Sequence, residues 1–429
     1  MEGYRWPVVA LVTAVLGLGS PGGAAEPLAC MQRFKLHDFV IGAWWGPDPS
    51  DRNYRMYQDA SFNVLMTYRN RANPKYGRDY QLPDTELMLA QKVGLWVMLD
   101  TYMRNDRPWG GADLNPPPED PSHHSARPAE LTWLQRQYGH HPRLVGYLLG
   151  DNCGLHGYMA DNAKTLLATA PGLFPWMSTN PDIEAQARAP MPLLTTQNYP
   201  FLYQVNESEP AKRRAFCNRL ELDRQCANRY DIALWPFVNC CDAVSPSQLR
   251  FQVFTSVAYG AQGIWYFHYH GNIWDPKEEQ PGPLYEAAKA CNSYIASVIG
   301  PRVVGRRCTG VFHTVGPETA DKALTPGPGQ LIEQMSDALL AGVLAPEKRL
   351  KAGRDDPDYL LLVDKRTVRP DEEEPPVRAV HIKFGPSVQT VTIFGADTTS
   401  RAAIERHLPD SRTLRLRMGA GEGVLLKVN

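Results

Sequence analysis

Asp151 and Asp242 are the two residues of this chain whose type and position best suit acid–base chemistry. Asp151 ends the apolar run LVGYLLGD, and Asp242 follows the run ALWPFVNCC. Two carboxyl groups on opposite sides of a glycosidic bond can cleave it, because one protonates the leaving oxygen while the other attacks or activates water. Each aspartate alone could instead cap a helix or bond loop amides. The hypothesis is that Asp151 and Asp242 form a catalytic pair.

Other polar and aromatic residues end or follow similar apolar runs. Amide, hydroxyl and imidazole groups can hydrogen-bond to sugar hydroxyls, and flat aromatic rings offer apolar platforms for sugar rings. The predicted substrate-binding residues are Trp44, Trp45, Asp100, Tyr102, Asn152, Asn180, Asn198, Tyr199, Asn239, His268, His270 and Trp274. Among the tryptophans, Trp44 and Trp274 are better placed for stacking than Trp265, for which core packing is expected.

His268 and His270 raise the alternative of a metal-dependent hydrolase. If residues 263–270 form a strand, both imidazoles lie on the same face, and Asp242 could join them around a divalent cation. No obvious fourth ligand accompanies them, and the chain contains no CxxC pair with zinc-finger spacing. Hydrogen bonding to a sugar is therefore favoured for the histidines, and we predict no metal and no cofactor.

The elements that would position these residues are eight short runs rich in β-branched and aromatic side chains. Amphipathic stretches separate them, a pattern typical of βα units and a parallel sheet. The runs span residues 39–45, 62–68, 95–102, 144–151, 173–179, 193–199, 233–239 and 263–270. Eight such units predict a (β/α)8 TIM barrel over residues 30–304. The carboxyl ends of its strands would bring the candidate residues together at one end.

The pattern changes after about residue 305. Short alternating runs separated by Gly, Pro and acidic turns predict a small antiparallel β-sandwich over residues 305–429. Within it, the stretch 331–344 (LIEQMSDALLAGVL) is expected to form a helix, or a helix followed by a strand. The fold class is therefore α/β, with a barrel followed by a sandwich.

The N-terminal residues predict export. One Arg, an apolar run from Val8 to Leu18 and small residues ending at Ala25 are typical of a cleaved signal peptide over residues 1–25. The apolar run is short for a membrane span, so we expect a secreted or periplasmic protein without stable membrane insertion. With 45 Lys and Arg against 46 Asp and Glu, the net charge of −1 does not favour a nucleic-acid partner. The oligomeric state and the pairing of the eight cysteines stay undetermined.

Several of these motifs resemble a known family. FVIGAWWGP, GYLLGD and SVAYGAQGIWYFHYH resemble the barrel domains of secreted glycoside hydrolases related to the β-galactosidase and clan A groups. The tail TLRLRMGAGEGVLLKV resembles the β-sandwich that often follows such barrels. The resemblance implies a carbohydrate substrate and hydrolysis by carboxyl groups.

The chain departs from that family at the decisive positions. The relatives usually carry a catalytic Glu at the end of strand four, where this chain has Asn152. They usually present a second Glu on strand seven, and ALWPFVNCCD contains none. An amide cannot donate and recover a proton, so Asn152 cannot replace the acid. Either Asp151 is the acid, with its pKa raised by apolar neighbours, or the barrel binds carbohydrate without hydrolysing it.

Overall fold

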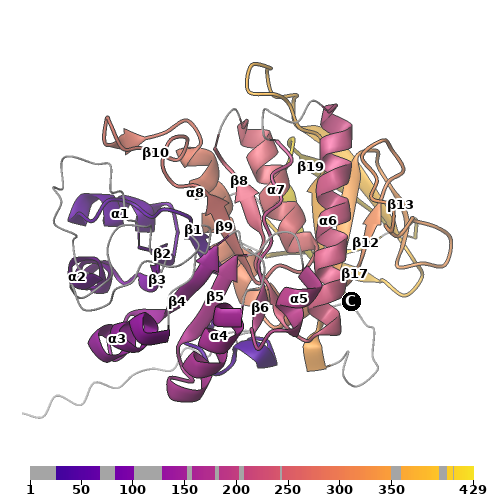
Figure 1. The fold of residues 1–429 in the computed structure, drawn as a ribbon. Coiled ribbons are helices and arrows are strands. Elements are labelled where there is room, and N and C mark those ends of the chain that lie inside the picture. The colour runs from indigo at the N-terminus through magenta and orange to yellow at the C-terminus, as the bar shows by residue number, and fades with distance from the viewer. Residues whose placement is uncertain are drawn as a thin grey trace, which may run out of the picture.

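The fold is described from a computed structural model. It describes residues 26–67, 83–100, 128–151, 157–178, 183–201, 207–241, 244–348, 359–395, 403–408 and 410–429. Figure 1 shows a parallel sheet of βα units, curled upon itself, beside a second region made of antiparallel strands. The predicted fold class, a TIM barrel followed by a β-sandwich, is thereby confirmed.

The barrel strands follow the eight predicted runs. Their bounds are β1 (Val40–Ala43), β2 (Val64–Met66), β3 (Trp96–Asp100), β4 (Leu144–Asp151), β5 (Phe174–Ser178), β6 (Leu193–Leu194), β7 (Ala233–Leu234), β8 (Phe237–Asn239) and β9 (Gly263–Phe267). They pair in parallel in the order β5-β4-β3-β2-β1-β9-β8, and β6 pairs with β7. Pro236 separates β7 from β8. The two are halves of one barrel strand, because main-chain bonds to both neighbouring strands continue between them: Trp235 N donates to Leu194 O, and Trp265 N donates to Pro236 O.

Side chains join β5 to β6. Trp176 Nε1 donates to Thr195 Oγ1 at 2.9 Å, and Gln197 Nε2 donates to Ser178 Oγ at 2.7 Å. No main-chain ladder between these two strands is present in the described residues. The barrel is therefore closed at this point by polar side chains that point into it.

Helices surround the barrel on its outer side. Their bounds are α1 (Asp51–Asp59), α2 (Pro83–Val93), α3 (Pro128–Tyr138), α4 (Gly157–Thr169), α5 (Ile183–Arg188), α6 (Glu209–Arg229), α7 (Pro246–Ala258), α8 (Tyr285–Tyr294) and α9 (Gly300–Val303), with a π-helical turn at Ile295–Ile299. Serine side chains cap α1, α6 and α7, and Ser245 forms a reciprocal capping box with Gln248 at the start of α7. Each of these caps pairs backbone N–H groups that a helix start leaves free.

The barrel interior is packed with aromatic rings. Trp176 stacks on Trp265 with 4.2 Å between ring centroids, and Phe174 stacks on Trp235 at 4.9 Å. The core packing expected for Trp265 is therefore observed. The N-terminal segment closes the amino end of the barrel: a short 3-10 turn (Ala29–Met31) is followed by Phe34, whose ring meets Phe174 at 4.7 Å. The barrel interior is thus a filled core, and the N-terminal segment covers its amino end.

The C-terminal region contains two antiparallel sheets. The larger has the order β12-β14-β15-β20-β17-β18, and the smaller has the order β13-β16-β19. Their strands are β12 (Arg306–His313), β13 (Ile332–Met335), β14 (Leu339–Pro346), β15 (Tyr359–Asp364), β16 (Arg378–Phe384), β17 (Thr390–Phe394), β18 (Ala403–His407), β19 (Thr413–Met418) and β20 (Gly423–Val428), while short β10 (Trp274–Asp275) and β11 (Gln280–Pro281) lie beside the barrel. The expected helix over 331–344 is wrong, because β13 and β14 occupy that stretch.

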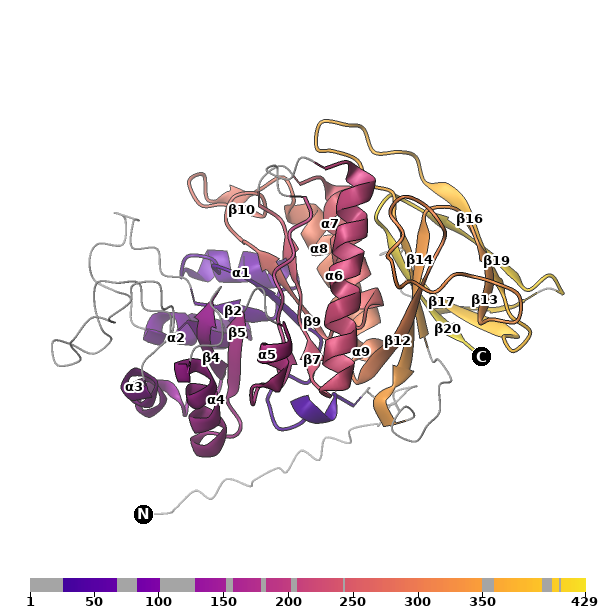
Figure 2. The same cartoon turned by 45° about the vertical axis from the view of Figure 1, so that its right-hand side comes forward.

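The two regions are packed against each other through helices. Figure 2 shows α6 and α7 standing between the barrel strands and the C-terminal sheets. Buried residues of α7, including Val257, belong to the same apolar cluster as Leu340 of β14, Leu361 of β15 and Leu425 of β20. The larger sheet is therefore covered by barrel helices on one face and by the smaller sheet on the other. No helix within the described residues is both long and apolar enough to cross a membrane.

Candidate functional site

Four aromatic side chains gather where barrel strands end. We call Trp45, Tyr199, Phe267 and His268 the aromatic set. The ring of Trp45 lies 4.8 Å from that of His268, and Tyr199 stacks on Phe267 with 4.9 Å between centroids and 24° between planes. All four are half-buried. They come from the ends of β1, β6 and β9, so the barrel closure is what brings them together.

The backbone of Trp45 is in an unusual conformation. Its φ is +51°, in the left-handed region that bulky residues rarely occupy. Main-chain bonds on both sides hold it there: Trp44 N donates to Tyr266 O, Tyr269 N donates to Trp44 O, and Gly46 N donates to Met66 O. Such conformations persist where the surroundings determine them, often at functional positions. The structure therefore fixes the indole of Trp45 next to His268.

Polar side chains accompany the aromatic set. Asp100 ends β3 two residues after Met98, which lies in the barrel interior, so the alternation of the strand turns Asp100 to the same side. Asp100 is half-buried, and its backbone N–H donates to Thr67 Oγ1 at 2.9 Å. Gln197 and Ser178 bond to each other at the seam between β5 and β6. Thr67, Ser178, Gln197 and Phe267 were not among the predicted substrate-binding residues, although strand alternation from Trp176 and Trp265, which lie in the barrel interior, could have identified Ser178 and Phe267.

Asn239 is a buried donor without a partner at the end of β8. It is fully buried, and its Oδ1 accepts from Cys241 N at 3.0 Å and from Cys241 Sγ at 3.0 Å. Its Nδ2 has no hydrogen-bond partner. A buried donor of this kind costs about 1–3 kcal/mol, and such groups cluster at sites that bind or react. Cys241, half-buried beside it, adds a thiol to the same strand end.

The two predicted catalytic aspartates are described only in part. The backbone of Asp151 ends β4 and pairs in register with Ser178 of β5, which places Asp151 at the carboxyl end of the barrel. Its side chain lies outside the part that the structure describes. Asp242, Tyr102, Asn152 and Asn180 also lie outside the described residues. Their roles remain predictions.

Three predicted substrate-binding residues lie elsewhere than expected. Trp44 is 6% exposed and packs inside the barrel against Trp176 and Phe237, and Trp274 is 1% exposed and stacks on Tyr269. Neither indole presents a free face to a ligand, so neither can be the predicted sugar platform in this conformation. Asn198 points outward, because its Nδ2 donates to Phe216 O of α6 at 3.4 Å. The sequence pattern located the barrel strands but could not show which way these three side chains point.

The two histidines also differ from the expectation. Strand β9 ends at Phe267, so strand alternation does not extend to His270. His270 is 8% exposed, its Nε2 lies 3.0 Å from Gly46 O, and burial lowers its pKa. Its ring thus supports the loop that carries Trp45. Within the described residues, no group of three or more His, Cys, Asp or Glu side chains is arranged to hold a metal ion.

Comparison with known proteins gives similarity of fold without similarity of sequence. No protein-family model and no curated protein matches the sequence. A catalytic mutant of a GH42 β-galactosidase from G. stearothermophilus is similar in structure, with a TM-score of 0.52, 10% identity and coverage of 94% of this chain and 100% of that one. The same enzyme in another structure gives a TM-score of 0.51 at 9% identity, covering 94% of this chain and 100% of that one. A glycoside hydrolase family 30 subfamily 8 xylanase from Clostridium acetobutylicum gives 0.48 at 10% identity, covering 94% and 97%. The chain has the fold of TIM-barrel glycoside hydrolases, a barrel followed by a β-rich domain.

Proposed function

We propose that this protein is a secreted glycoside hydrolase that acts on an oligo- or polysaccharide at the carboxyl end of its barrel. The observation that carries the proposal is the aromatic set, in which side chains from three strand ends lie together at the one end of the barrel that is not closed by the N-terminal segment. Half-buried aromatic rings beside hydrogen-bonding side chains suit a sugar, which has apolar ring faces and polar edges.

The chemistry of the proposal requires two carboxyl groups. Asp151 would protonate the leaving oxygen, and Asp242 would attack the sugar or activate water from the other side of the bond. Asp100 is a half-buried carboxylate at the end of β3, bonded through its backbone N–H to Thr67, and would hold a substrate hydroxyl. In this assignment the aromatic set orients the sugar ring, and the carboxyl groups come from the last residue of β4 and from the stretch that follows β8.

A non-catalytic carbohydrate-binding barrel is the second candidate. Two observations favour it: Asn152 stands where the family resemblance expects an acid, and the end of β8 carries Asn239 and Cys241 where it expects a carboxylate. Both candidates use the aromatic set for binding. They differ only in whether a glycosidic bond is cleaved.

The decisive experiment is a screen of the purified protein against neutral and acidic polysaccharides, with measurement of released reducing ends. Asp151→Asn and Asp242→Asn should each lower the rate at least about 100-fold, the usual size of a general acid–base contribution. Asp161→Asn is the matched control, because Asp161 is an exposed aspartate of the barrel helix α4. Full activity of Asp151→Asn would overturn the catalytic assignment. Binding of a glycan without any cleavage by the wild type would establish the second candidate.

The aromatic set is tested separately by binding. Trp45→Ala should weaken binding of the cleaved glycan by roughly tenfold, and Trp45→Phe should retain most of it, because the ring provides the contact. Trp133→Ala, a change of a half-buried tryptophan on α3, is the control. Export is tested by N-terminal sequencing of the protein recovered outside the cytoplasm, for which the proposal expects residues 1–25 to be missing.

A further inference from the structure

The outer face of the smaller C-terminal sheet carries a group of basic side chains. Leu414 and Met418 of β19, and Val380 and Ile382 of β16, point into the sandwich core. The residues that alternate with them therefore point outward. We call these outward side chains, His381, Lys383, Arg415 and Arg417, the basic face. Figure 2 shows β16 and β19 on the side of the molecule away from the barrel strands.

The strand register places these side chains in a compact array. His381 lies opposite Arg415, and Ala379 lies opposite Arg417. Facing side chains in an antiparallel pair start about 5 Å apart, and residues two positions apart on one strand start about 7 Å apart. The two arginines are exposed, and the small side chain of Ala379 leaves the region beside Arg417 open. A ligand lying along β19 could contact both guanidinium groups.

The charges of this face are not balanced within the protein. Lys383 pairs with Glu333 at 3.0 Å, and the same carboxylate is 3.5 Å from Arg412. The side chains of Arg415 and Arg417 form no ion pair or hydrogen bond with any described residue. The carboxylate of Glu333 therefore pairs with two cationic side chains, and Arg415 and Arg417 are left to bind an external anion. The acidic residues 371–374 lie on the loop before β16, and Glu374 pairs with Arg250 of α7.

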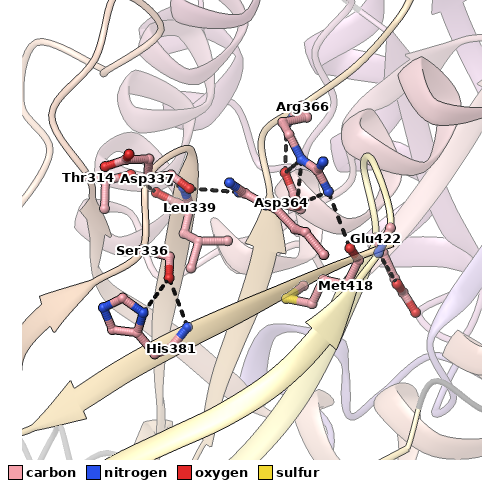
Figure 3. A network of polar contacts seen from close by, with 11 residues as sticks. Thr314, Ser336, Asp337, Leu339, Asp364, Arg366, His381, Met418 and Glu422 are labelled. Atoms are coloured by element: carbon pink, nitrogen blue, oxygen red, sulfur yellow. Dashed lines mark hydrogen bonds and ion pairs between the residues drawn. The ribbon is translucent and has the colours of Figure 1, made fainter. Parts of the chain in front are cut away.

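Hydrogen-bonding side chains lie on the same face as the two arginines. Figure 3 shows Ser336 bonded to His381: Ser336 Oγ lies 2.8 Å from His381 Nδ1 and accepts from His381 N at 2.8 Å. This arrangement orients the imidazole and leaves its Nε2 toward solvent. Gln334 and Thr413 lie across from Lys383 on the neighbouring strands. The face therefore offers two strong cationic forks together with groups that hydrogen-bond to hydroxyls.

We propose that the basic face binds a carboxylated polysaccharide. The planar guanidinium fork matches a carboxylate in a bidentate pair, and the neighbouring amide, hydroxyl and imidazole groups match sugar hydroxyls. Double-stranded DNA carries a charge about every 1.7 Å and calls for denser cations, and among its described residues this face has no Phe, Tyr or Trp ring on which single-stranded bases could stack. The choice of a polysaccharide rests on the proposed function of the barrel, whereas the anion requirement rests on the two arginines alone.

The test is affinity electrophoresis of the full chain in gels containing polygalacturonate, with gels of neutral galactan, DNA and no polymer run alongside. The wild type should be retarded by polygalacturonate, and added salt should reduce the retardation because exposed charges are screened. Arg415→Gln/Arg417→Gln should bind at least about tenfold more weakly, roughly 1.4 kcal/mol. Arg406→Gln should bind like the wild type, because Arg406 is an exposed arginine on β18 of the other sheet.

Two outcomes would overturn the inference: no retardation of the wild type by polygalacturonate, or equal retardation of the double variant. Stronger binding of DNA than of polygalacturonate through the same arginines would also overturn the choice of partner. Trp45→Ala separates this inference from the proposed function, since it should leave the retardation by polygalacturonate unchanged while weakening the barrel site. A barrel without hydrolytic activity, combined with arginine-dependent retardation, would refute the proposed hydrolase and leave the basic face supported. If the double variant unfolds at the same temperature as the wild type, misfolding is excluded as the cause of lost binding.

Discussion

The hydroxyl of Tyr259 lies 3.0 Å from Nε2 of His313, and this contact joins the end of α7 to the last residue of β12. Both side chains are buried at the junction of the barrel and the sandwich. Lys365, also fully buried, pairs with Glu318 at 3.1 Å nearby. Burial, followed by the charge of Lys365, lowers the pKa of His313 from 6.5 to about 3. The junction therefore holds His313 in its neutral form.

His313 should make the protein less stable in acid. Because its pKa in the folded protein is below that in the unfolded chain, only the unfolded chain binds the proton between about pH 6.5 and pH 3. The free energy of unfolding should therefore fall as the pH is lowered through this window, by up to about 1.4 kcal/mol per pH unit. Urea unfolding of wild type and His313→Gln at several pH values checks this, since the variant should lose that slope. The same slope in His313→Gln would contradict it, and exposed His407→Gln is the control.

Asp223 should have the opposite effect on the pH dependence. It is fully buried on α6, where it accepts from Thr196 Oγ1 at 2.6 Å and from Arg219 Nε at 2.9 Å. Burial outweighs these contacts and raises its pKa from 3.8 to about 6. The folded protein then keeps a proton that the unfolded chain has lost, so this contribution to stability is full below about pH 4 and is lost as the pH rises through 6. Comparing unfolding of Asp223→Asn and wild type from pH 4 to pH 7 measures this, with Asp161→Asn as control.

A methyl group at Gly342 should disrupt the junction of β14 with α7. A Cβ atom built there would lie 1.9 Å from Ala258 O, and a main-chain oxygen cannot move aside without shifting the helix. Gly342→Ala should therefore lower the free energy of unfolding by about 1–3 kcal/mol or more. Gly172→Ala is the control, since its nearest neighbour would be 4.0 Å away. Equal stability of the two variants by chemical unfolding would show that the two regions pack less closely than described.

The N-terminal closure of the barrel should contribute strongly to stability. Phe34 is 1% exposed and its ring contacts Phe174 at the amino end of the barrel. Phe34→Ala removes a buried aromatic ring and should cost about 3–5 kcal/mol. Exposed His37→Ala on the same segment should cost little. Thermal unfolding of the two variants measures the difference, and a small effect of Phe34→Ala would mean that the segment is not part of the core.

The eight barrel strands could be read from the sequence because β-branched and aromatic runs separated by amphipathic stretches are a local property. The ends of the strands could not be read from the sequence in this way. Local pattern extended the last strand to His270, whereas the structure ends it at Phe267, where Cys240 N and Cys241 N both donate to Phe267 O. The stretch 331–344 is a similar case: its apolar residues suited a helix, but β13 and β14 pair with strands distant in sequence.

The candidate site, too, could be predicted from the sequence only in part. Sequence alone determined that polar and aromatic residues follow the strands and that Asp151 ends one of them. Only the tertiary structure decided which side chains point inward, because strands of a barrel are buried on both faces and alternation gives parity without direction. Thus Asn198 bonds to α6 and Trp274 stacks on Tyr269, while Trp45 meets His268 and Tyr199 stacks on Phe267. Those contacts join residues far apart in the chain, and barrel closure, rather than any local pattern, brings them within reach.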